Sequence, residues 1–160
     1  MTIQPVLTNP NKELRKNSEI VPVSEIQTKE MEQLIEDLIE TMKVENGVGI
    51  AAPQIGVLKR VIIVETGDNG PQAFINPTII AKSFGKEEGE EGCLSVPGVY
   101  GLVKRHKRIT VQAHLPSGQE VTIKAEGFPA VVFQHEMDHL DGVLFIDRVT
   151  RYTKPPKHVL

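Results

Sequence analysis

Apolar residues recur every three or four positions between Thr28 and Glu45, in the stretch TKEMEQLIEDLIETMKVE, and acidic residues fill most of the positions between them. The apolar positions are Met31, Leu34, Ile35, Leu38, Ile39 and Met42. Because an α-helix completes a turn in about 3.6 residues, this spacing places them on one face. The pattern predicts an amphipathic helix, and the hydroxyl of Thr28 suits its N-cap.

Four shorter stretches have the composition of β-strands. RVIIVE (Arg60–Glu65) and QAFINP (Gln72–Pro77) are rich in apolar residues and enclose the turn-forming segment Gly67–Pro71. We therefore expect two buried strands joined by a turn. ITVQAHL and EVTIKAE alternate apolar and polar residues on either side of Pro116–Gly118, which predicts an antiparallel hairpin.

A second helix is predicted from Pro129 to Leu140. Proline suits the first position of a helix, and Gly142 stands just past the expected end. The first half of the segment is apolar all round, which indicates a helix buried in the core. The alternative is a strand, because Val131 and Val132 are β-branched.

These elements predict an α+β fold, with mostly antiparallel sheets packed around the central buried helix. No internal repeat or linker divides the chain, so residues 1–160 are expected to form a single domain. The end of the chain, from about residue 148, is expected to be a short irregular tail. The segment Lys154–Lys157, KPPK, contains two prolines and is not compatible with a helix.

Charge and composition narrow the function classes. The chain has 160 residues and a net charge of −3, which predicts neither a nucleic-acid partner nor a membrane-surface role. The first residues show no targeting pattern, and no apolar run approaches the ~20 residues of a membrane span. We therefore expect a cytoplasmic protein, monomeric by default. The single cysteine, Cys93, excludes an internal disulfide.

The stretch QHEMDHLDG places His135 and His139 four residues apart, with Glu136 directly after the first histidine. On the predicted helix these imidazoles share one face, one turn apart, which is the spacing of two metal ligands. Glu136 can take a proton from water activated by the metal. The alternative is that two buried histidines satisfy each other and the backbone.

A two-histidine site needs a further ligand. Downstream, the third-histidine position of one large peptidase class is occupied by Phe145, and no glutamate follows Glu136, so Asp147 is the only oxygen candidate there. Upstream, the lone Cys93 lies in EGEEGCLSVPG, in what we expect to be a loop or strand edge. One cysteine and two histidines suit a divalent ion with a position open for water. The alternatives are a small buried hydrophobic residue or a nucleophile paired with a metal-free histidine.

The stretch GVGIAAPQ, from Gly47 to Gln54, matches a dinucleotide-binding pattern of glycines. That pattern has meaning only between a strand and a helix. Here a helix precedes it, and Pro53 interrupts any helix that follows, so we reject the nucleotide interpretation. Gly47 and Gly49 instead allow the backbone to approach an extended ligand, or make a tight turn into a strand, and Gln54 offers an amide donor.

GVGIAAPQ, EGCLS and QHEMDH, in this order, resemble the three sequence blocks of peptide deformylases, and looser similarity extends from about Pro5 to Asp147. The resemblance implies a single catalytic domain that removes the N-formyl group from formyl-methionine at the start of newly made polypeptides and releases formate. It implies that Cys93, His135 and His139 bind the metal. The other implied catalytic groups are Glu136 as general base and proton donor, and Gln54 with the backbone N–H of Leu94 as oxyanion donors.

The same resemblance implies that Gly49 pairs with the substrate backbone. Helical spacing places Val131 and Val132 on the His135 face, and with Phe128, Val48 and Leu94 they are expected to line a pocket for the methionine side chain. We also expect Glu91 to pair with Arg105. Tyr100 lies where many bacterial relatives carry an arginine that contacts the substrate. Fe²⁺ is the usual ion of the family, and Zn²⁺, Ni²⁺ or Co²⁺ suit the same ligands.

Two other functions remain possible on the residues alone. One is a metallopeptidase that cuts internal peptide bonds, which the missing downstream ligands disfavour. The other is a non-catalytic iron or redox sensor built on Cys93, which would not need Glu136 and Gln54. The expected partners are formyl-methionyl nascent chains, met transiently near the ribosome but without the C-terminal docking helix of longer relatives.

Overall fold

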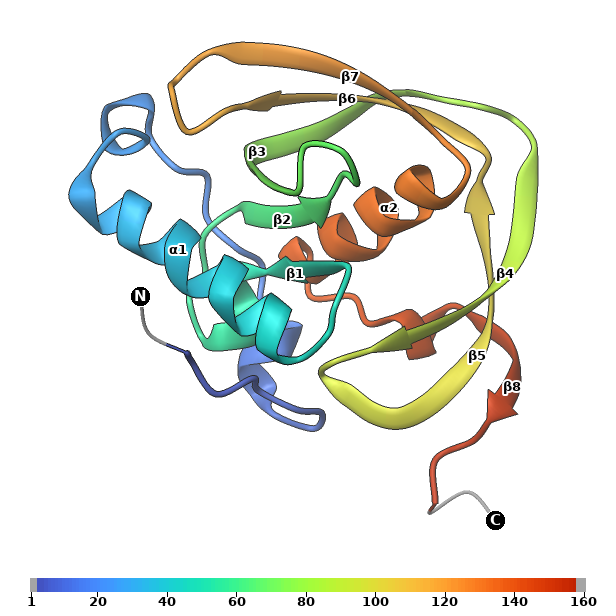
Figure 1. The fold of residues 1–160 in the computed structure, drawn as a ribbon. Helices are drawn as coiled ribbons and strands as arrows, with labels where there is room; N and C mark the ends of the chain where they lie inside the picture. The colour runs from blue at the N-terminus through green and yellow to red at the C-terminus, as the bar shows by residue number, and fades with distance from the viewer. Residues whose placement is uncertain (1–2, 158–160) are drawn as a thin grey trace.

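The computed structural model describes residues 3–157, which form two antiparallel sheets and two α-helices (Figure 1). The larger sheet has the strand order β1-β2-β3-β6-β7. Its strands are β1 Gly49–Ala51, β2 Val61–Glu65, β3 Pro71–Lys82, β6 Arg108–His114 and β7 Glu120–Glu126. The smaller sheet has the order β4-β5-β8, with β4 Lys86–Cys93, β5 Val96–His106 and β8 Val149–Lys154. Neither helix is long and apolar enough to cross a membrane.

Helix α1, Lys29–Val44, covers one face of the larger sheet. The Thr28 hydroxyl accepts a hydrogen bond from the backbone N–H of Met31 at 3.3 Å, so the predicted N-cap is confirmed. Met31, Leu38 and Met42 are buried against Val61 and other apolar residues of the sheet. The apolar stripe read from the sequence is therefore the face that packs on the strands.

Helix α2, Phe128–Leu140, covers the other face of the larger sheet, and it begins one residue before the predicted start. Phe133 packs against Phe74 with ring centroids 5.0 Å apart. Figure 1 shows α2 enclosed between the larger sheet and the curved β4–β5 pair. The alternative of a strand at Val131 and Val132 is wrong, because burial on several sides favours a compact apolar helix there.

The two helices explain the continuous apolar run of β2. Ile62 and Val64 belong to the core under α2, whereas Val61 and Ile63 belong to the core under α1. Because successive side chains of a strand point to opposite faces, a strand buried on both faces is apolar at every position. The predicted strand pairs are confirmed: β2 pairs with β3, and β6 pairs with β7.

The smaller sheet differs from the prediction. β4 and β5 form a long antiparallel pair that the sequence pattern did not reveal. The irregular tail expected from about residue 148 is wrong, because Val149–Lys154 forms β8 and pairs with β5. The side chains of β8 are almost all exposed, so no apolar alternation marks it, and the backbone of β5 supplies the hydrogen-bonding partner.

Gly142 ends α2 in a left-handed conformation, with φ at +72°, and its N–H donates to the carbonyl of His139. A Cβ there would overlap the backbone of Arg15. We expect Gly142→Ala to lower the free energy of unfolding by about 1–2 kcal/mol for the backbone conformation, and by about 1–3 kcal/mol more for the overlap. Urea denaturation followed by circular dichroism measures both.

Gly67→Ala is the matched control. Gly67 has φ at +76°, but a Cβ there meets no atom within 4 Å, so only the conformational cost is expected. Equal losses of stability in the two variants would contradict the packing of Gly142 against Arg15.

Candidate metal centre and the groove beside it

Three side chains from two distant parts of the chain meet at one point. His135 and His139 lie one turn apart on α2, and Cys93 is the last residue of β4. One ligand atom from each lies within 4.8 Å of the others, and Cys93 Sγ is 3.4 Å from His139 Nε2. The downstream candidate does not join them, because Asp147 forms an ion pair with Arg15. Of the two candidate third ligands, only Cys93 lies beside the histidines.

This donor set fits a divalent metal ion. A thiolate and two imidazoles around a tetrahedral ion at 2.0–2.3 Å lie about 3.3–3.6 Å from one another, and the 3.4 Å separation of Cys93 Sγ and His139 Nε2 falls in that range. Beside them Glu136 Oε2 is buried without a hydrogen-bond partner among residues 3–157. A buried polar atom without a partner is costly unless water or a ligand completes the site.

Glu91 orients the first histidine. Its carboxylate lies 2.9 Å from His135 Nδ1 and receives two hydrogen bonds from Arg105, at 3.0 and 2.9 Å. Burial by itself would raise the pKa of Glu91, but the hydrogen bonds from His135 and Arg105 outweigh it and lower the pKa to about 2. Because Glu91 is ionised, it keeps a proton on His135 Nδ1, and Nε2 is the ring nitrogen that a metal ion could use. The predicted pairing of Glu91 with Arg105 is confirmed.

The pKa values of the two histidines shift in opposite directions, although burial lowers both. Burial lowers the pKa of His139 well below its ordinary value, so this ring is neutral, as a metal ligand must be. Burial would also lower the pKa of His135, but hydrogen bonds to Cys93 and Glu91 raise it above the ordinary value.

Glu136 lies where the backbone of β1, at Gly49, comes close to α2. Glu136 is 5% exposed, and burial raises the pKa of its carboxyl group to about 7. A Cβ at Gly49 would lie 2.7 Å from Glu136 Oε1 and 2.9 Å from Val132 Cγ1. Position 49 therefore favours glycine, because the backbone of β1 passes directly over this carboxyl group. The sequence had predicted a close approach to a ligand or a tight turn, not this contact within the protein.

Gln54 reaches the site from η3, Ala52–Ile55, a short 3-10 helix after β1. Its Oε1 accepts from the N–H of Ala51 at 2.9 Å, which holds the amide in place. Its Nε2 donates to Ser95 Oγ at 3.0 Å and lies 3.7 Å from Cys93 Sγ. Sequence reasoning assigned Ser95 no role, although it stands two residues after Cys93 in the EGCLS block.

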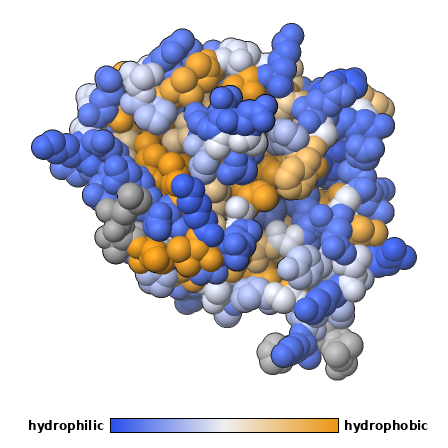
Figure 2. Space-filling model, in the orientation of Figure 1, coloured by the Kyte–Doolittle hydropathy of each residue, from blue (hydrophilic) through white to orange (hydrophobic). Residues whose placement is uncertain are grey.

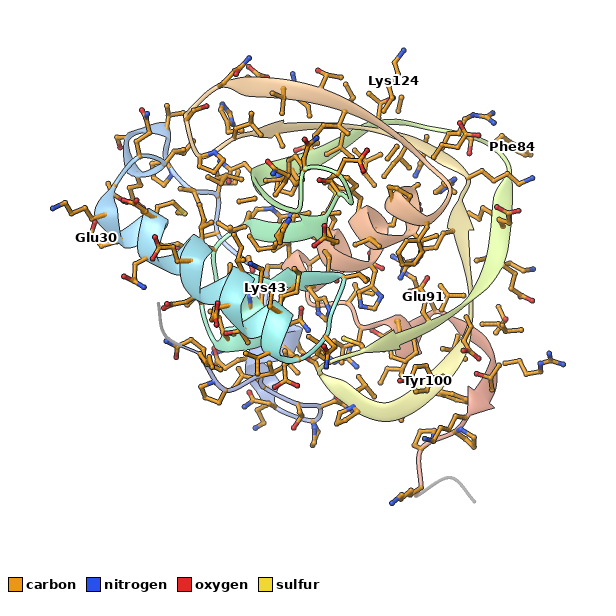
Figure 3. The ribbon with its side chains drawn as sticks, in the orientation of Figure 1. Glu30, Lys43, Phe84, Glu91, Tyr100 and Lys124 are labelled. Atoms are coloured by element: carbon orange, nitrogen blue, oxygen red, sulfur yellow. The ribbon has the colours of Figure 1, made fainter. Side chains whose placement is uncertain are left out.

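A groove of about 720 Å³ opens beside the three ligands. All the residues predicted to contact substrate line it: Val48, Gly49, Tyr100, Phe128, Val131 and Val132. Figure 2 shows hydrophobic side chains near the centre of the face turned to the viewer, and Figure 3 shows Glu91 of β4 and Tyr100 of β5. Leu94, Gln54 and Glu136 also line the groove, whereas His139 lies beneath it.

Strand edges and acidic groups border this groove. β1 and β4 are edge strands of their sheets, and both contribute residues to the groove. An edge strand offers free backbone N–H and C=O groups to a peptide. The exposed carboxylates of Glu45, Glu87 and Glu90 also line the groove, and no lysine or arginine of the described chain does. The sequence pattern did not indicate this acidic rim.

Comparison with known proteins agrees with these observations. The family model of polypeptide deformylase matches residues 3–155. A peptide deformylase of Desulforudis audaxviator is 47% identical over 150 residues, which cover 94% of this chain and 91% of that protein. One of Halothermothrix orenii is 53% identical over 135 residues, covering 84% and 86%. The crystal structure of peptide deformylase from Thermotoga maritima superposes with a TM-score of 0.89 at 39% identity, covering 94% and 99%.

The ion pairs behind His135 differ in burial, and we expect this difference to decide how much each contributes to the free energy of unfolding. Arg105, 5% exposed in its side chain, binds both Glu91 and Asp138, whereas Arg148, 46% exposed, binds Asp138 alone. Arg105→Met leaves two carboxylates without their buried partner and is expected to lower the free energy of unfolding by about 3–5 kcal/mol. Arg148→Met, the control, is expected to cost less than about 1 kcal/mol. Guanidinium denaturation measures both, and similar losses would refute this account of Glu91.

Proposed function

The chain belongs to the polypeptide deformylase family, and from this premise we propose which residues carry its reaction. The enzyme removes the N-formyl group from formyl-methionine at the start of newly made polypeptides and releases formate. The observation that carries the assignment is the meeting of Cys93 Sγ with the two imidazoles of α2, beside the partnerless Glu136 Oε2.

In this proposal Cys93, His135 and His139 hold one divalent metal ion, with α2 as the central helix that carries the motif. Fe²⁺ is the ion we expect, and Zn²⁺, Ni²⁺ or Co²⁺ would suit the same donors. When bound, the ion makes water nucleophilic at neutral pH and polarises the formyl carbonyl. Glu91 keeps the Nε2 of His135 directed at the ion by holding the proton on Nδ1.

Glu136 moves the proton in two steps. Its carboxylate takes a proton from the water that adds to the formyl carbon, and later gives that proton to the nitrogen that leaves as the C–N bond breaks. The second transfer is necessary because an amide anion is too poor a leaving group. The pKa of about 7, raised by burial, makes Glu136 suited to both accepting and donating a proton near neutral pH.

The tetrahedral oxyanion is stabilised by two donors, the Nε2–H of Gln54 and the backbone N–H of Leu94. Gln54 is 1% exposed and its Oε1 is held by Ala51, so its amide does not have to reorganise when charge develops. Ser95 Oγ occupies a Gln54 donor before substrate binds.

The substrate peptide lies extended in the groove, with its backbone paired to β1 at Gly49. The methionine side chain occupies the apolar part, formed by Val48, Leu94, Phe128, Val131 and Val132. Tyr100, 42% exposed at the groove, offers a hydroxyl but no charge to the following residues. We place the enzyme in the cytoplasm as a monomer, meeting formyl-methionyl chains near the ribosome.

Glu136→Ala and Cys93→Ala separate proton transfer from metal binding. We expect Glu136→Ala to keep its metal and to lower kcat by about 10²–10⁴-fold, because a general acid–base contributes that much. Cys93→Ala is expected to lose both metal and turnover. Formate release from a formyl-Met-Ala-Ser peptide and metal content by mass spectrometry test both variants. A fully active Glu136→Ala enzyme would defeat the assignment.

Gln54→Met removes the oxyanion donor while keeping an unbranched side chain of similar length. We expect kcat to fall about 100-fold or more, equivalent to about 3 kcal/mol, with little change in KM. Ser95→Ala is the control, because it removes the hydroxyl that Gln54 contacts and leaves the donor itself intact. Steady-state kinetics compare them, and the role of Gln54 is rejected if both variants lose activity equally.

A further inference from the structure

A second cavity, of about 520 Å³, lies on the side of α2 that faces away from the metal ligands. Gln134, Met137 and Asp138 line it from one face of α2, because residues three or four apart share a face, and Asp141, the C-cap of the helix, lines it as well. Its other walls are the ends of β3 and β5. The proposed reaction makes no use of this cavity.

Positive charge is concentrated around this second cavity. Six of the 18 lysines and arginines of the chain line it, with only two acidic residues, Asp138 and Asp141. The six are Arg60, Lys82, Lys86, Lys104, Arg105 and Arg148. The protein as a whole carries a charge of −3, so this positive field is produced by the tertiary structure and not by the composition.

Three of these cations are already paired with aspartates, and the other three are free to bind a ligand. Arg105 and Arg148 form ion pairs with Asp138 of α2, and Arg60 forms one with Asp141, the C-cap of the helix. Lys82, Lys86 and Lys104 are exposed, and within the described chain their side chains form no ion pair or hydrogen bond. Glu88 stands opposite Lys104 in the strand register, but its carboxylate accepts a hydrogen bond from the hydroxyl of Thr150.

An exposed aromatic ring stands beside the lysines. Phe84 is fully exposed in the turn between β3 and β4, with Lys82 two residues before it and Lys86 two residues after it (Figure 3). The turn is held in place, because Ser83 N–H donates to the carbonyl of Arg108, and Ser83 Oγ donates to the carbonyl of Gly85. The ring is therefore presented to solvent by an anchored turn.

We propose that this cavity and Phe84 together bind single-stranded RNA, with phosphates at the three lysines and a base stacked on the ring. A cationic groove beside an exposed aromatic side chain is the usual arrangement for a single strand. Phe84 does not line the cavity, whereas both of its neighbouring lysines do. A ligand that contacts the lysines and the ring must therefore be longer than one phosphate group. A flat lipid surface could reach Phe84 but not the floor of the cavity, where Met137 is 8% exposed.

The net charge of −3 predicted no nucleic-acid partner, because it takes into account only the sum of the charges. The RNA-binding proposal depends instead on how the charges are distributed over the surface. It is independent of the catalytic assignments, because none of the residues involved lines the groove beside the metal centre.

The test measures binding of a fluorescein-labelled RNA of twelve nucleotides to the full, metal-loaded protein by anisotropy, over a range of KCl concentrations. The variant K82Q/K86Q/K104Q is expected to bind at least tenfold more weakly. Its slope of log affinity against log salt is expected to fall by about 2, at about 0.7 for each single-strand phosphate contact. K12Q/K29Q/K43Q removes the same charge from exposed positions away from the cavity, and we expect its affinity to stay within twofold of the parent.

Phe84→Ala tests the stacking contact and is expected to weaken binding about fivefold or more. Ile20→Ala, which removes another strongly exposed apolar side chain, is the control and is expected to have no effect. Inorganic phosphate at millimolar concentration should not displace the RNA, and a glutamate peptide of twelve residues should bind less tightly than RNA.

Equal affinity in the two lysine variants overturns the proposal. The proposal is also overturned if the glutamate peptide binds as tightly as the RNA and Phe84→Ala has no effect on RNA binding, because the site would then attract any polyanion. Formate release is measured on every variant, and unchanged turnover shows that each is folded. A failure of the catalytic assignments would leave the RNA result intact, since the two measurements concern different surfaces.

Discussion

A single buried carboxylate, that of Glu91, ties the strand that ends at Cys93 to the helix that carries His135 and His139. It accepts hydrogen bonds from His135 on one side and from Arg105 on the other, and Arg105 in turn binds Asp138 on the same helix. A buried carboxylate without such partners costs several kcal/mol. β4 and α2 are therefore held in an arrangement that gives the Glu91 carboxylate its partners. Cys93 stands two residues after Glu91 on β4, so the same arrangement brings its sulfur to the imidazoles.

Helix α2 separates two cavities of opposite charge. On the groove side the exposed charged groups are carboxylates, including those of Glu87 and Glu90, whereas the far side carries Lys82, Lys86 and Lys104. One helix can serve both because residues three or four apart share a face, so each cavity draws on a separate set of positions. The fields differ in sign, so a polyanion is attracted to the far side of α2 and repelled from the groove.

The elements that could be predicted were those whose side chains are buried in a regular pattern. The stripe from Met31 to Met42, the run of β2 and the alternation of β6 and β7 each reflect packing on a core. β4 and β8 were missed or expected to be irregular, because their order depends on backbone pairing with strands distant in sequence. β5 alternates between buried and less buried positions from Val99 to Arg105, but the buried positions include Gly101 and Arg105, so no apolar alternation marks it. The exposed side chains of Lys86–Glu90 and Val149–Lys154 leave little pattern to read.

By itself the sequence determined which chemical groups are present and which of them are neighbours along the chain: two imidazoles one helical turn apart, with a carboxylate between them. These features follow from local geometry, since helical spacing depends only on residues close together in the chain. The family resemblance already pointed to Cys93 and not to Asp147, but the tertiary structure alone decided that the backbone at Gly49 passes close to Glu136, that Ser95 meets Gln54, and that a third of the basic residues surround one cavity. Such contacts join residues tens of positions apart, and only the packing of distant elements against one another brings them together.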